Sequence, residues 1–98
     1  MSSTYKEVES FFQTNERLLD SLHTSLNKVK EQINTVDEIS LNANHILFQE
    51  QSRQLKYNLS ELHRLREELA HQQARLEDQI VVLERQQARL QQQLNRLH

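Results

Sequence analysis

The sequence predicts an all-α protein built as a long helical coiled coil, and three observations support this. Its 98 residues include no glycine and no proline, the residues that form tight turns and end helices. Only 5% of the residues are aromatic and 36% are hydrophobic, too few to fill the interior of a compact domain. Leucine recurs at every seventh position from Leu55 to Leu97, a repeat typical of helices that pack along one seam.

The first coiled-coil segment is expected over residues 1–47, where apolar residues alternate at spacings of three and four. The anchors of this seam are Leu19, Leu22, Leu26, Val29, Ile33 and Val36. Further large apolar residues occupy g positions, directly before the a positions: Phe11, Leu18, Ile39 and Ile46. An apolar stripe over a, d and g suits a helix in a multi-helix bundle better than a thin two-stranded seam.

The second segment is expected over residues 48–98 and is of the leucine-heptad type. Its d positions are Leu55, Leu62, Leu69, Leu76, Leu83, Leu90 and Leu97. Its a positions include Leu59, Arg66, Gln73, Ile80, Gln87 and Leu94. Because burying one leucine contributes roughly 1.5–3 kcal/mol, this seam should be covered by another chain or by the first half of the same chain.

The two heptad registers do not join smoothly. The first places an a position at Leu47 and the second places one at Ser52, so the phase slips between about residues 40 and 54. Without glycine or proline, we favour one continuous or gently kinked rod that absorbs the slip as a change of winding. The alternative is a helical hairpin broken near residues 40–45, where Asn42 and Asn44 weaken the helix.

Polar residues at a positions predict how the seam selects its partner. In a homodimer Arg66 would face its own copy, a like-charge contact that an acidic or amide neighbour in a different chain would relieve. The alternative is that Arg66 extends out of the seam on its long stem. Arg66, Gln73 and Gln87 are therefore expected to set partner and register, and Val81 and Val82 to need cover from a bundle or a docked partner.

Composition excludes several functional classes. The formal charge of −2 gives no sign of a nucleic-acid surface, and a rod this thin offers no pocket for catalysis. We expect no catalytic residue, no cofactor and no metal site, since there is no cysteine and no pair of histidines one turn apart. No stretch is long and apolar enough for a membrane span, and the N-terminus lacks a signal peptide, which predicts a cytoplasmic or nuclear location.

Two short stretches carry a family resemblance. The segment Phe11-Phe-Gln-Thr-Asn-Glu-Arg-Leu-Leu19 resembles the F-x-x-T-N-E-x-L-L opening of KxDL-type subunits of lysosome-positioning complexes. Residues 15–31 are also similar to the first helix of pallidin-type subunits of complexes that form lysosome-related organelles. The resemblance covers about a fifth of the chain. It implies an elongated hetero-oligomer of helices that acts as a tether or adaptor on endosomes or lysosomes.

The sequence therefore favours a non-enzymatic structural subunit of a hetero-oligomeric coiled-coil complex. Its expected partners are other coiled-coil chains, through which it would reach a membrane surface only peripherally. One alternative is a self-contained homodimeric adaptor whose strip around Val81 and Val82 captures a client. Small coiled-coil subunits of kinetochore or spindle complexes share the same pattern and form a second alternative.

Overall fold

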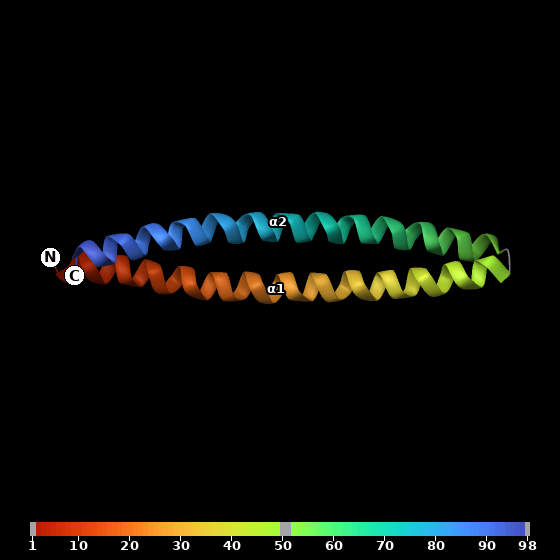
Figure 1. Ribbon diagram of the computed structural model, residues 1–98, viewed down its shortest axis with the longest axis horizontal. Coiled ribbons are helices and arrows are strands. Elements are labelled where there is room, and N and C mark those ends of the chain that lie inside the picture. The colour runs from red at the N-terminus through yellow and green to blue at the C-terminus, as the bar shows by residue number, and fades with distance from the viewer. Residues whose placement is uncertain (1, 50–51, 98) are drawn as a thin grey trace. The chain divides into compact units, whose positions relative to one another are not determined.

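The computed structural model describes residues 2–49 and 52–97, and nearly all of them are helical. Helix α1 spans Ser2–Gln49 and helix α2 spans Arg53–Leu97 (Figure 1). The prediction of an all-α fold is confirmed. The chain forms two helices rather than one continuous helix, so the favoured continuous form is wrong.

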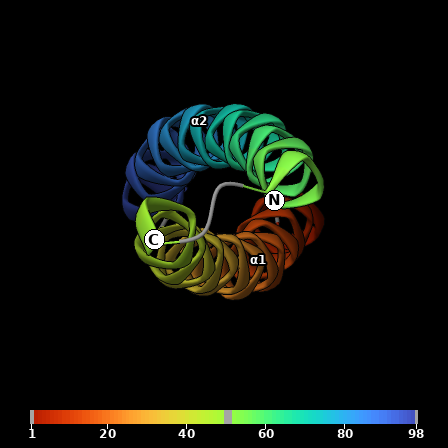
Figure 2. The same ribbon diagram turned by 90° about the vertical axis from the view of Figure 1, so that its right-hand side faces the viewer.

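The helices pack in two compact units, each of which contains a segment of both. Unit 1 comprises Met1–Leu26 and Leu76–His98, and unit 2 comprises Asn27–Arg75. In unit 2 the end of α1 and the start of α2 form an antiparallel helical hairpin, seen end-on in Figure 2 with these two helix ends nearest the viewer. In unit 1 hydrogen bonds join the first part of α1 to the last part of α2, and these segments are also antiparallel.

The break between the helices lies later than the sequence suggested. Residues 40–45 are helical, although the hairpin alternative placed the break there. Asn42 and Asn44 are exposed, while Ala43 between them is buried and continues the seam, so packing overrides the weak helix propensity of this stretch. The break falls within the interval where the two heptad registers slip.

Ser52 caps the start of α2. The Leu55 backbone N–H donates to the Ser52 hydroxyl oxygen at 3.3 Å, and the Lys56 N–H donates to the Ser52 carbonyl at 3.1 Å. The first N–H groups of a helix have no partner within it, and a serine hydroxyl at the N-cap satisfies one of them. The a position that marks the new register is thus also the N-cap of the new helix.

The core of each unit is a narrow line of a and d side chains. In unit 1 the buried residues are Asn15, Leu26, Ile80 and Leu94. In unit 2 they are Val29, Ile33, Val36, Ala43, Leu59 and Leu69. Among the described residues no side chain is completely enclosed. Two helices bury one stripe of each other and leave the flanks of that stripe open to water.

We expect Ser52→Ala to lower the free energy of unfolding by about 0.5–2 kcal/mol, because the Leu55 N–H loses its acceptor. Urea unfolding followed by circular dichroism measures this. Ser60→Ala is the matched control, since Ser60 is exposed in the interior of α2 and alanine is the better helix former there. Equal stability of Ser52→Ala and the unchanged chain would contradict the cap.

Candidate functional site

Most of the residues predicted to form the packing seam lie between α1 and α2 of the same chain. Eight of the predicted residues are buried: Leu26, Val29, Ile33, Val36, Leu59, Leu69, Ile80 and Leu94. Others are half-buried: Leu19, Leu22, Leu55, Leu62, Gln73, Leu76, Leu83 and Leu90. Arg66 and Leu97 are exposed. Unit 1 brings together the members from residues 19–26 and 76–97, and unit 2 those from 29–36 and 55–73.

Arg66 finds its counter-charge within the chain. Its Nε donates to Oδ1 of Asp37 at 2.8 Å, across the two helices of unit 2, and about half of each side chain is exposed. Arg66 therefore leaves the seam on its stem, as the second of the two interpretations predicted. An exposed pair of this kind contributes about 0–1 kcal/mol. The like-charge clash that favoured a hetero-oligomer does not arise in this arrangement.

A polar layer interrupts the seam of unit 1. Asn15, only 8% exposed, donates from Nδ2 to Oε1 of Gln86 at 3.0 Å. Gln87 donates from Nε2 to the carbonyl oxygen of Phe12 at 3.0 Å. Gln87 Oε1 is buried and accepts no hydrogen bond from the described part of the chain. Polar residues inside a seam fix its register at a cost in stability, and this layer does so for the antiparallel pairing.

The sequence analysis did not find Asp37 or Gln86 as partners. Asp37 lies 29 residues before Arg66, and Gln86 lies 71 residues after Asn15. Such pairings follow only from the antiparallel register, which heptad spacing within one segment does not specify. Asn15 at a d position was the available signal of a polar layer.

The g positions form an uncharged row along α1 that remains partly open to water. In unit 1 Phe11 is 65% exposed, and Leu18 is also exposed. In unit 2 Ile39 and Ile46 are each 47% exposed. The g row of α2 is uncharged as well, with Leu65 followed by glutamines at 72, 79, 86 and 93. The g rows themselves therefore present no charge to a further helix that packs on this side of either unit.

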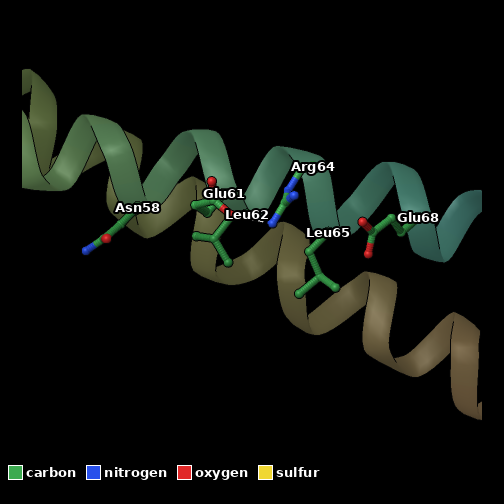
Figure 3. A pocket seen from close by; sticks show the side chains of 6 residues that line it. All are labelled: Asn58, Glu61, Leu62, Arg64, Leu65 and Glu68. Atoms are coloured by element: carbon green, nitrogen blue, oxygen red, sulfur yellow. Dashed lines mark hydrogen bonds and ion pairs between the residues drawn. The ribbon is translucent and has the colours of Figure 1, made fainter.

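Shallow apolar grooves lie on this same side. In unit 1 one groove is lined by Leu18, Leu22, Val82 and Leu83, with Asp78 and Gln79 at its margin. In unit 2 Leu65 and Leu69 of α2 meet Val36 and Gln32 of α1 along another, with Lys28, Glu31 and Thr35 at its margin. Figure 3 shows a third groove, lined wholly by α2 and mostly by polar residues, in which Leu62 and Leu65 point towards α1 and Asn58, Glu61, Arg64 and Glu68 complete the lining. Helix grooves of this kind suit an amphipathic helix rather than a small molecule.

Val81 and Val82 are exposed, as the run of four apolar residues suggested for a two-helix arrangement. Val82 is 61% exposed and belongs to the groove side of unit 1, while Val81 lies at a b position on the other flank of α2. The two valines therefore do not form one continuous strip. Only Val82 adds apolar surface to the grooves.

Among residues 2–49 and 52–97, no three His, Asp or Glu side chains gather where they could hold a metal ion. Over the same residues, neither helix combines the length and apolar character needed to cross a membrane. Comparisons with known protein families, with curated proteins and with solved structures find no match for this chain.

Replacing both Asn15 and Gln87 by leucine should raise the free energy of unfolding by about 1 kcal/mol or more. The reason is that an apolar pair removes the buried Gln87 oxygen that has no donor. The same variant should lose its single register and sediment as a mixture of species. Urea unfolding and sedimentation velocity measure the two effects, with the exposed Gln92→Leu as control. A less stable double variant would show that the layer is a net stabilising contact.

Proposed function

We propose that the chain is a non-enzymatic structural subunit of a hetero-oligomeric coiled-coil complex. The observation that supports this most directly is the uncharged g row of α1, whose large apolar side chains stay exposed beside grooves in each unit. Packing between α1 and α2 buries most of the a and d side chains of each unit. The g row of α1 remains as a second apolar stripe that is partly exposed. A stripe of this kind is what a helix presents to a further helix in a bundle.

The energetic reason lies in the residues that two helices cannot cover. Full burial of a large apolar side chain contributes roughly 1.5–3 kcal/mol, so covering half-exposed Phe11, Leu18, Ile39 and Ile46 contributes several kcal/mol together. Association costs a comparable amount in lost freedom, so a complementary helix with its own apolar stripe is needed to make the contact stable. The expected partners are accordingly other coiled-coil chains.

The proposed site of action is the cytoplasmic surface of endosomes or lysosomes, where the complex would act as a tether or adaptor. This part of the proposal rests on the resemblance of residues 11–19 and 15–31 to KxDL-type and pallidin-type subunits. In the resembling stretch Leu19, Leu22 and Leu26 pack within unit 1, while Phe11 and Leu18 face outward. Membrane association would be peripheral and would depend on the partner chains.

A homodimeric adaptor is the second candidate, and the pairing of Arg66 with Asp37 favours it. That ion pair satisfies Arg66 within one chain, so self-association no longer brings two unpaired arginines together. Exposed Val82 would then contribute to the client-binding surface.

We expect the double substitution Ile39→Gln with Ile46→Gln to abolish partner binding while the chain keeps its helical content. Both residues lie on the g row, outside the seam that holds the helices together. Cross-linking in cell extract, followed by mass spectrometry of the joined chains, tests this. The expected partners are coiled-coil proteins that are lost from the variant.

The matched control is Leu41→Gln with Phe48→Gln. These residues are exposed in the same unit, Phe48 at 90%, but occupy b positions on the other flank of α1. The control should retain every partner that the unchanged chain binds. Equal loss from both variants, or loss from the control alone, would show that the g row does not carry the assembly.

A further inference from the structure

The c positions of α2 form a row whose charge changes sign along the helix. In order along the chain they are Gln54, Glu61, Glu68, Arg75, Val82, Arg89 and Arg96. The two acidic residues lie in unit 2, and Arg89 and Arg96 lie in unit 1. Within each pair the members are seven residues apart, about 10.5 Å along a helix. One helix thus carries an acidic pair and a basic pair of equal spacing.

The acidic pair borders the groove drawn in Figure 3. Glu61, Glu68 and exposed Leu65 line this groove on α2. Glu61 contacts Arg64 one turn away at 2.8 Å, but 43% of the Glu61 side chain and 71% of the Arg64 side chain are exposed, so this pair contributes only a few tenths of a kcal/mol. Glu68 has no ion pair among the described residues. Both carboxylates therefore remain able to pair with an incoming cation.

The basic pair lies in unit 1, on the same row of α2 as Val82. Arg89 and Arg96 are exposed and form no ion pair with any described residue. One heptad before Arg89, Val82 lines the groove together with Leu18. The row therefore presents an apolar residue followed by two cations at heptad spacing.

We propose that a second copy of this chain binds along the α2 c row, with its α2 antiparallel to the first. In this alignment Glu61 and Glu68 of one copy lie opposite Arg96 and Arg89 of the other. A parallel alignment would instead bring each charge against its own copy. This contact goes beyond the assembly proposed above and does not require it.

The same alignment leaves no like charges opposed along the c row. Arg75 comes to lie opposite Val82, where its aliphatic stem covers the exposed valine. Because every copy carries both segments, the contact is self-complementary. The acidic pair lies within unit 2 and the basic pair within unit 1. The contact joins unit 2 of one copy to unit 1 of the other.

Charge reversal tests the contact on the full chain. Glu61→Arg with Glu68→Arg should raise the dimer Kd roughly tenfold or more, since four ion pairs become four repulsions. Arg89→Glu with Arg96→Glu should do the same. Combining all four substitutions restores opposite charges and should return the Kd to within about a factor of three of the unchanged chain. Sedimentation equilibrium gives each Kd, and circular dichroism confirms that each variant is helical.

The control variant is Glu77→Arg with Glu84→Arg. It changes the net charge by the same amount at the same spacing, but at e positions, and should leave the Kd unchanged. The proposal is overturned if the unchanged chain is monomeric, if the two reversals do not weaken the dimer, or if the fourfold variant fails to restore it. If the chain is monomeric but still binds coiled-coil partners through Ile39 and Ile46, the proposed dimer is overturned and the proposed function stands. If the chain forms a charge-dependent dimer but binds no other chain, the proposed function is overturned and the dimer stands.

Discussion

The packing of one narrow apolar stripe of α1 against one of α2 is the constraint on which the structure depends. A chain without glycine, proline, cysteine or tryptophan has few means of stability other than laying helices side by side. Each unit buries only a single line of a and d residues, including Leu26 and Ile80 in unit 1 and Ile33 and Leu69 in unit 2. The seam holds the helices together and leaves the g and c flanks available, so stability and binding use different faces of the same helices.

Polar residues determine which antiparallel register the seam adopts. A leucine repeat by itself tolerates shifts by one heptad, because every d position is the same residue. The bonds from Asn15 to Gln86 and from Gln87 to the Phe12 carbonyl are made in one register of unit 1, and the Asp37–Arg66 pair in one register of unit 2. The buried oxygen of Gln87 shows that this specificity costs some stability.

Heptad spacing was sufficient to predict the helical class and the buried faces, since it reports directly which side of a helix is apolar. It also located the phase slip that contains the break before α2. The low helix propensity of Asn42 and Asn44 wrongly suggested a break at residues 40–45, because propensity does not account for the packing of Ala43 between them. Partners such as Asp37 for Arg66 could not be found, because they depend on how the chain reverses. The seam residues could be predicted from the heptad spacing. The exposed g row could be interpreted as a candidate binding surface only after the structure showed that α1 and α2 pack their a and d side chains against each other.

The ion pair of Arg66 with Asp37 has a consequence for how the protein is made in the cell. A cation whose counter-charge came from a second polypeptide would need that polypeptide to be present before its side chain could pair. Here Asp37 supplies the counter-charge within the chain, and most of the seam leucines pack between α1 and α2. The helices of a newly made chain can therefore pair without a second polypeptide.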